Sequence, residues 1–506
     1  MSTYRYLPVA SALAIALAAA CALGACTVGP DYQGAPPVAS DAAHSATFVR
    51  ASSANVLTTR APSAWWRTLG DTQLNALIDA ALAHNPDVHA AQERLRQARA
   101  QLVRQRADEL PKLSANAAAP RMREPNLGTF LSQGGNGSTG SAGGGQGPLQ
   151  LYTAGLDASW EIDLFGGTRR AIEAQSAQAE ALDADLADTQ VSLAAEVAQA
   201  YVDLRDEQQR LALAQRSADA QQRMLTLTQQ RRAGGTAADV DVERLTGQVQ
   251  TTRATLVPLD AQIAESLDRL AVLTGRAPGA LDAGLSTSQA MPTLPTSVPI
   301  GEPATMLRQR PDIRAAERRL ASSNAQIGEH VADYFPKVSL LGDLGYTAAE
   351  PAHLFRKTNF SWAGLPYLQW NVFDFGRTTA DVHSAQAARD EASARYEHTV
   401  LAALQDANTA LSRYGHQREH LVRLQAVQAS ADHAATLMDQ RYRAGVATLI
   451  DLLDTQRTQF SAQQDVVAGQ AELLKDFVLL QKSLGLGWQT EAEPDSSVQT
   501  AQDRNN

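Results

Sequence analysis

The sequence predicts a mixed, mainly α-helical fold, in which an internally duplicated chain supplies four membrane β-strands and long coiled-coil helices. The duplication is visible as thirteen identities among the 29 aligned positions of residues 86–114 and 311–339, at a constant offset of 225. Two segments that end near Phe165 and Phe375 partly alternate apolar and polar residues, which is typical of membrane strands. A proline-free stretch of more than 60 residues follows each segment and is rich in helix-forming residues.

An export signal is predicted at the N-terminus. Arg5 precedes a long apolar run, and small residues lead from this run to Cys26, which is the pattern of a secretory signal. The four residues Leu-Gly-Ala-Cys that end at Cys26 resemble the lipobox of bacterial lipoproteins. This resemblance implies that residues 1–25 are removed and that Cys26 is acylated, and Thr27 resembles the residue that follows in lipoproteins sorted to the outer membrane. Because the other cysteine, Cys21, precedes this point, we expect no disulfide in the processed chain.

Composition restricts the class of protein. The net charge of −10 argues against nucleic acid as a partner. After the leader no segment has 18 continuous apolar residues, so any membrane crossing is expected to use β-strands. We expect the following domains: a lipoprotein signal peptide at 1–25, a lipidated N-terminal extension at 26–70, a first repeat at 71–275, a linker at 276–303, a second repeat at 304–487 and a flexible tail at 488–506.

Each repeat is predicted to run helix, strand, loop, strand, long helix, turn and helix. In the first repeat, a helix from Asp71 to about Asp108 ends before Pro111, since the residue before a proline disfavours helix. A strand follows Pro111, and the Gly/Ser-rich tract 134–147 is predicted to be a surface loop. The other predicted elements are the strands that end near Phe165 and Phe375, long helices at about 170–232 and 378–443, and return helices at about 237–274 and 447–484.

The number of strands implies an oligomer. Four strands cannot close a membrane barrel, and an open sheet edge in lipid leaves backbone groups unpaired at a cost of several kcal/mol each. A trimer would supply twelve strands, an even number in the bacterial range. The predicted assembly is therefore a trimeric 12-stranded β-barrel on a helical barrel, with a hollow interior.

These features together carry a resemblance to a known family. The chain resembles the TolC-like outer-membrane factors, and among them the lipoprotein efflux branch, the OprM/NodT type, of tripartite resistance–nodulation–division systems. The residues that carry it are Cys-Thr-Val-Gly-Pro-Asp-Tyr at 26–32, Trp-Trp-Arg at 65–67, Asn-Pro-Asp at 85–87 and Arg-Pro-Asp-Ile-Arg at 310–314.

The resemblance implies both a place in the cell and a set of partners. It implies a homotrimer that is lipid-anchored in the outer membrane of a Gram-negative bacterium and extends into the periplasm. A periplasmic adaptor would connect this trimer to an inner-membrane transporter of the resistance–nodulation–division class. The expected function is a passive exit duct for drugs or other small toxic compounds, and the expected partners include outer-membrane lipid but no nucleic acid.

The resemblance also assigns candidate residues at the ends of the helical hairpins. The turns of the two hairpins would contact the adaptor through Arg232, Ala233, Gly234, Arg443, Ala444 and Gly445. By its spacing from the second turn, Asp451 matches aspartates that line the pore of family members, and so does Asp454. Tyr442 is a candidate gate residue. In the first hairpin, Asp239 and Asp241 lie near the equivalent place, but their spacing from Gly234 differs.

Three other interpretations compete with efflux. The same fold could serve as the outer-membrane channel of a type I protein-secretion system, although the lipobox favours efflux. A lipid-anchored coiled-coil scaffold would not need the predicted strands. The His-x-x-Glu-His pattern at His416, Glu419 and His420 resembles that of zinc peptidases, but it lies in the middle of a long helix without an evident third ligand. We therefore predict a protein that is not an enzyme and has no catalytic residues, cofactor or metal.

Overall fold

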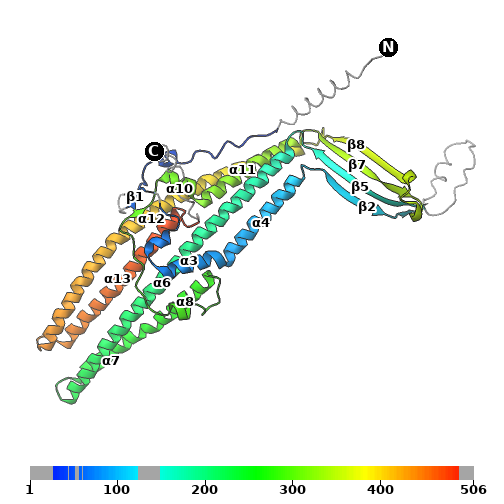
Figure 1. Ribbon diagram of the computed structural model, residues 1–506. Helices are drawn as coiled ribbons and strands as arrows, with labels where there is room; N and C mark the ends of the chain where they lie inside the picture. Colours follow the sequence, from blue (N-terminus) through cyan, green and yellow to red (C-terminus); the bar gives the residue numbers. More distant parts are fainter. Residues whose placement is uncertain (1–26, 44, 52–55, 60, 123–148, 489–506) are drawn as a thin grey trace, which may run out of the picture. The chain divides into compact units, whose positions relative to one another are not determined.

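The computed structural model describes residues 27–43, 45–51, 56–59, 61–122 and 149–488. The chain forms two compact units, each made of three segments. The first unit contains residues 1–34, 97–179 and 319–392, and the second contains residues 35–96, 180–318 and 393–506. Figure 1 shows the long helices and the sheet of which these units are built.

The first unit is organised around a four-stranded antiparallel sheet in the order β2-β5-β7-β8. Its strands are β2 (Lys112–Ala118), β5 (Tyr152–Ile162), β7 (Lys337–Ala348) and β8 (Phe360–Gln369), which lie side by side in Figure 1. The prediction of a four-stranded sheet in a mainly helical chain is thus confirmed. Short strands that the sequence did not predict are also present in the described residues, and they form two separate two-stranded ladders.

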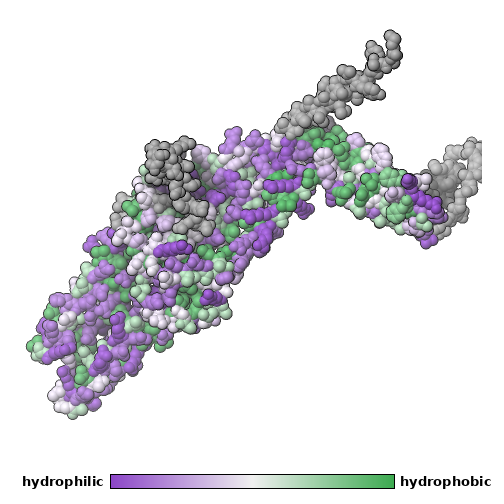
Figure 2. All heavy atoms as spheres, in the orientation of Figure 1, coloured by the Kyte–Doolittle hydropathy of each residue, from purple (hydrophilic) through white to green (hydrophobic). Residues whose placement is uncertain are grey.

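Strand register sorts the sheet into one apolar and one polar face. Because side chains alternate along a strand, Trp160 and Leu340, which are paired across β5 and β7, lie on one face, and Asp157 and Asp343 lie on the other. The apolar face continues on β8 with Leu368, Trp362 and Phe360. Figure 2 shows hydrophobic residues gathered over the visible side of these strands.

The two hairpins of the sheet repeat each other in register. Lys112 pairs with Ser159 in the β2–β5 hairpin. The residue 225 positions after Lys112 is Lys337, and the residue 210 positions after Ser159 is Gln369. These two residues are paired in the β7–β8 hairpin. The tryptophans obey the same offsets, since Trp160 Nε1 donates to the Glu109 carbonyl at 2.9 Å and Trp370 Nε1 donates to the Tyr334 carbonyl at 3.0 Å.

Two long helices connect the sheet to the helical hairpins of the second unit. They are α6 (Gly167–Ala233) and α12 (Arg377–Arg443), each of 67 residues. In the second unit α6 is followed by α7 (Asp239–Ala254) and α8 (Leu256–Leu273), and α12 is followed by α13 (Leu449–Ser483). The returning helices lie beside the outgoing ones (Figure 1). None of the described helices is both long and apolar enough to cross a membrane.

The remaining elements include one 22-residue helix in each repeat, α4 and α11, and several shorter helices and strands. They are α2 (Ser40–Ala43), β1 (Val56–Leu57), the 3₁₀ helix η2 (Trp65–Leu69), α3 (Thr72–His84), α4 (Pro86–Ala107), β3 (Arg121–Met122), β4 (Leu149–Gln150), α9 (Asp282–Leu285), β6 (Val298–Pro299), α10 (Pro303–Gln309), α11 (Pro311–Ala332), η3 (Pro351–His353) and η4 (Lys357–Asn359). Trp65 and Trp66 are buried with Phe477 in the main core of the second unit.

Two helix predictions were wrong in the same way, because each predicted helix is divided. The helix expected over 71–108 breaks at Asn85, which is extended before Pro86. Asn85 compensates for the break, since its side chain donates to the Leu273 carbonyl at 2.9 Å and accepts from the Asp87 N–H at 2.8 Å. The helix expected over 237–274 divides at Thr255, three residues before Pro258, which has no N–H to continue the ladder.

Candidate functional site

The turns at the ends of the two hairpins have the same backbone geometry. Gly235 and Gly445 both have a φ of 74°, in the left-handed region that glycine tolerates best. After Gly235 the Thr236 N–H donates to the Arg231 carbonyl at 2.8 Å, and after Gly445 the Val446 N–H donates to the Arg441 carbonyl at 3.0 Å. Both turns thus end their helices with the bond that characterises a Schellman motif.

This geometry corrects how the two hairpins correspond. Aligning the two Arg-Ala-Gly motifs pairs Gly234 with Gly445. The glycine with left-handed backbone geometry in the first turn is Gly235, however, so equivalent residues of the two turns are 210 positions apart in the sequence. It is the same offset that relates β5 to β8. Ala238 and Thr448, which precede α7 and α13, follow it as well. The structural counterpart of Asp451 is therefore Asp241, because each lies six residues after its left-handed glycine.

Asp451 is held at the start of α13 by a capping box with Thr448. Its carboxylate accepts from the Thr448 hydroxyl at 2.6 Å and from the Thr448 N–H at 3.1 Å, while its own N–H donates to the Thr448 hydroxyl oxygen at 3.2 Å. Hydrogen bonds from Thr448 and the charge of Arg441 lower the pKa of Asp451. An exposed carboxylate thus remains ionised at the end of the second hairpin.

The two hairpins differ in charge close to this point. Asp454 lies one turn further along α13 and is exposed. Its counterpart at the offset of 210 is Arg244, which is exposed on α7. In the first hairpin Asp239 forms an ion pair with Arg232, whereas Asp241 lies half-buried beside it. The carboxylates predicted to line a pore therefore do not form two equal pairs.

Tyr442 bridges the two hairpins rather than standing alone. Arg231 Nη1 donates to the Tyr442 hydroxyl at 3.4 Å, and the Arg231 guanidinium lies 5.8 Å from the ring centroid. Tyr442 also packs against a small apolar cluster formed by Leu225, Leu245, Val249 and Leu449, which come from both hairpins. Arg231 was not predicted from the sequence, because its partner is 211 residues away.

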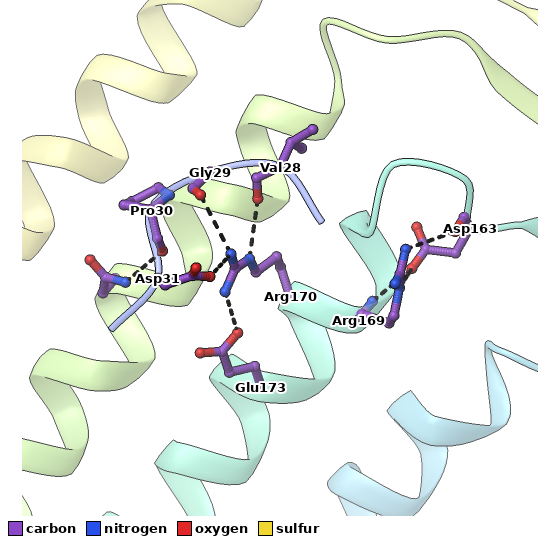
Figure 3. Close-up of polar contacts among 9 residues, drawn as sticks. Val28, Gly29, Pro30, Asp31, Asp163, Arg169, Arg170 and Glu173 are labelled. Carbon is purple, nitrogen blue, oxygen red and sulfur yellow. Dashed lines mark hydrogen bonds and ion pairs between the residues drawn. The ribbon is translucent and has the colours of Figure 1, made fainter. Parts of the chain in front are cut away.

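A second site holds the residues that follow the predicted lipid attachment point. Cys26 itself lies outside the described residues. Residues 27–31, which we call the N-terminal strap, lie against the start of α6 in the first unit (Figure 3). The Val28 N–H donates to the Phe165 carbonyl at 3.1 Å, and Asn324 Nδ2 donates to the Pro30 carbonyl at 2.9 Å.

Arg170 is the centre of this contact. Its side chain is only 4% exposed, and it donates to the Val28 carbonyl at 3.1 Å and to the Gly29 carbonyl at 3.4 Å. It also forms ion pairs with Asp31 at 2.5 Å and Glu173 at 2.7 Å. These charged partners outweigh the effect of burial, so the pKa of Arg170 is raised.

Glycines make the close approach of the strap possible. A Cβ added to Gly29 would lie 2.4 Å from the Gly328 Cα on α11, and the φ of Gly29 is 89°. A Cβ added to Gly328 would lie 2.8 Å from the Arg170 side chain. No sequence signal identifies Arg170, because nothing in the local pattern of α6 distinguishes it from the neighbouring Arg169.

The histidine pattern in α12 has ordinary helix-surface partners. His416 Nδ1 lies 2.7 Å from the Ser412 carbonyl oxygen, and Glu419 forms an ion pair with Arg423 at 3.2 Å. Among the described residues, no group of three or more His, Cys, Asp or Glu side chains is arranged to hold a metal ion.

Comparisons with known proteins agree over nearly the whole chain. The family model described as outer membrane efflux protein matches residues 77–276 and 303–486. The outer membrane protein OprJ of Pseudomonas aeruginosa is 33% identical over 480 residues, which cover 94% of this chain and 95% of OprJ. The antibiotic efflux pump outer membrane protein ArpC of Pseudomonas putida is 31% identical over 490 residues, covering 94% and 96%. The structure of the outer-membrane channel OprN, at 36% identity, covers 92% of this chain and 100% of OprN with a TM-score of 0.82.

Proposed function

The chain belongs to the outer membrane efflux protein family, and from this membership we propose that it is the exit channel of a tripartite pump in a Gram-negative cell. It is an efflux channel of the outer membrane. A periplasmic adaptor and an inner-membrane transporter of the resistance–nodulation–division class deliver the exported compounds. The channel itself is passive, and the transporter supplies the energy.

The observation that carries this proposal is the two-faced sheet at the end of the long helices. Its apolar face is suited to lipid, and its polar face, which carries Asp157, Asp343 and Lys337, is suited to a water-filled interior. Four strands cannot close on themselves, so three copies form a twelve-stranded barrel. The helices of the three copies form the periplasmic duct.

The ends of the two hairpins contact the adaptor, and they also form the gate of the channel. Arg232, Ala233 and Gly234 of the first turn lie beside Gly235, and Arg443, Ala444 and Gly445 form the second turn. Around the threefold axis, Asp451 and Asp241 form a lining of carboxylates. Asp454 continues this lining one turn further along α13, and Asp239 forms an ion pair with Arg232. Rings of like charge attract cations to a narrow opening. Tyr442, held by Arg231, limits how far the two hairpins of one chain can separate.

Small toxic compounds are the proposed cargo, with antibiotics first among them because ArpC, an antibiotic efflux pump protein, is similar along 96% of its length. Acylation of Cys26 anchors the chain to the outer membrane. The N-terminal strap fits this role, because Arg170 fixes the residues next to Cys26 at the start of α6, close to the end of β5.

Growth of a deletion strain on a panel of antibiotics, dyes and solvents tests the function. We expect hypersensitivity that the wild-type gene reverses. The double variant Asp451→Asn/Asp454→Asn keeps the fold and the volume of both side chains but removes the charge, and we expect altered resistance at wild-type protein levels. Unchanged growth on every compound, combined with loss of a secreted protein from the medium, would instead indicate protein secretion.

A further inference from the structure

Two histidines of α12 lie one turn apart on the same face of the helix. His416 and His420 are four positions apart in the sequence, and residues at this spacing are neighbours on a helix surface. Both residues are exposed, so an ion in solution can reach both rings. Neither ring has a role in the function proposed above.

The equivalent helix shows that side chains at these two positions meet. Asp206 and Arg210, which lie 210 positions before the two histidines, occupy the same places in α6. Their side chains form an ion pair in which Arg210 Nη1 and Asp206 Oδ2 are 3.5 Å apart. Because α6 and α12 are equivalent helices of the same length, the side chains of His416 and His420 can approach each other in the same way. Two imidazoles at this spacing can bind one ion.

The hydrogen bond of His416 determines which of its ring nitrogens is free. His416 Nδ1 lies 2.7 Å from the Ser412 carbonyl oxygen. A carbonyl oxygen only accepts, so Nδ1 carries the proton and Nε2 presents a lone pair. Histidines that bind metal ions commonly donate their other N–H to a carbonyl or carboxylate oxygen, which orients the ring and raises its basicity as a ligand. His416 is therefore held in the form that a metal ion requires.

We propose that His416 and His420 bind a divalent transition-metal ion at the surface of α12, and that Cu²⁺ binds there more tightly than Ni²⁺ or Zn²⁺. Imidazole suits all three ions, and the affinity of a given site is generally highest for Cu²⁺. Mg²⁺ and Ca²⁺ prefer oxygen ligands and are not expected to bind. Among the described residues no group of three or more His, Cys, Asp or Glu side chains is arranged around a metal ion. The site is therefore an open one with two protein ligands, and its ion is exchangeable.

The position of the pair in α12 gives the bound ion a physical effect. Gly415, the single glycine of α12, directly precedes His416. Glycine weakens a helix interior because its backbone loses more conformational freedom on folding than that of any other residue. An ion that binds His416 and His420 holds one helical turn closed beside this glycine and stabilises the folded form that binds it. Amide exchange around residues 415–420 should therefore slow when the metal is bound.

Copper binding by the full chain tests the site. The protein, purified in detergent with a tag that contains no histidine, would be titrated with Cu²⁺ by calorimetry, and nitrogen ligation would be followed by electron paramagnetic resonance. His416→Ala or His420→Ala should weaken binding roughly tenfold or more, since the loss of an outer-shell partner alone costs about 10–100-fold. His433→Ala is the matched control, because His433 is an exposed histidine of α12 whose neighbours four positions away are Ala429 and Leu437. Unchanged affinity in His416→Ala, or equal weakening by His433→Ala, would overturn the proposal.

A transplanted pair separates the loss of a ligand from any loss of the fold. In the double variant His416→Ala/His420→Ala, the further substitution Leu437→His places a histidine four positions after His433, and Leu437 is 47% exposed. We expect this variant to regain copper binding, and Leu437→Ala in the same background should not. If Leu437→His binds copper no better than the double variant does, two exposed histidines at this spacing do not suffice on α12 and the proposal fails.

Hydrogen exchange measures the effect on the helix. Saturating Zn²⁺ is expected to slow exchange in peptides that cover residues 415–420 of the parent chain, whereas Mg²⁺ should have no effect. The His416→Ala/His420→Ala variant should show no protection by Zn²⁺. Equal protection by Zn²⁺ in the parent and in this variant would place the ion elsewhere and contradict the site. Neither growth nor export enters these measurements, so their outcome is independent of the proposed efflux function.

Discussion

Arg170→Ala is expected to release the N-terminal strap from the first unit. Arg170 makes two bonds to strap carbonyl groups, of Val28 at 3.1 Å and of Gly29 at 3.4 Å, and an ion pair with Asp31. A hydrogen bond from a charged donor contributes about 1.5–3 kcal/mol, and the longer bond contributes less. Asp31 is 81% exposed, so its pair adds at most about 1 kcal/mol. The strap should therefore lose about 3 kcal/mol of docking free energy.

Hydrogen exchange at the Val28 amide measures this loss. The Val28 N–H donates to the Phe165 carbonyl, so it is protected only while the strap is docked. A loss of about 3 kcal/mol corresponds to exchange roughly 150-fold faster. Arg169→Ala is the matched control, since Arg169 is the neighbouring arginine on α6 and forms an ion pair with Asp163. A change of less than about fivefold in Arg170→Ala, or an equal change in both variants, would refute the reasoning.

Three further predictions concern the second unit. Gly235→Ala should destabilise the first turn by about 1 kcal/mol because of its positive φ, whereas Gly234→Ala should not, and denaturant unfolding of the two variants compares them. Thr448→Ala should lower the free energy of unfolding by about 1 kcal/mol and speed amide exchange in the first turn of α13, because the Asp451 N–H loses its hydrogen bond to the Thr448 hydroxyl. An unchanged exchange rate would contradict the capping role. Glu207, whose pKa burial raises to about 7, favours the protonated form in the fold, so stability is lost as pH rises from about 4.5 through 7. Glu207→Gln should remove that slope and raise the free energy of unfolding at pH 8 by about 1–2 kcal/mol after discounting for partial exposure, which a higher melting temperature would report. A slope that persists would exclude Glu207 as its source.

The two hairpins differ in charge, and this difference bears on the proposed gate. Asp241 and Asp451 occupy the same position relative to their turns, but Asp454 has Arg244 as its counterpart. In a trimer, the three second hairpins would therefore carry three Asp454 carboxylates at the position where the three first hairpins carry the guanidinium groups of Arg244. The second hairpin thus contributes the larger negative charge, which identifies it as the more sensitive target for charge-neutralising substitutions.

The sequence by itself determined the order of the elements and the duplication. Prolines, glycines and the change from helical to strand periodicity are local signals, so the two 67-residue helices were placed close to their observed bounds and all four main strands were found. The strand predicted to end near Phe375 ends earlier, at Gln369. The helix breaks at Asn85 and Thr255 were missed, because a single proline near the start of a good helical pattern can be read as part of one helix. Asp451 and Tyr442 were candidates because of the resemblance to a known family, and their role in a pore stays a prediction.

Only the tertiary structure decided which distant residues meet. Arg170 contacts a strap some 140 residues away, and Arg231 meets Tyr442 across 211 residues. Gly235 corresponds to Gly445 because both have the same positive φ. Aligning the two Arg-Ala-Gly motifs would instead pair Gly445 with Gly234, one residue earlier. Periodicity and propensity act over a few neighbouring residues, whereas these contacts depend on how strands and helices from different parts of the chain are paired. For this reason the register of the sheet could be read only from the folded chain.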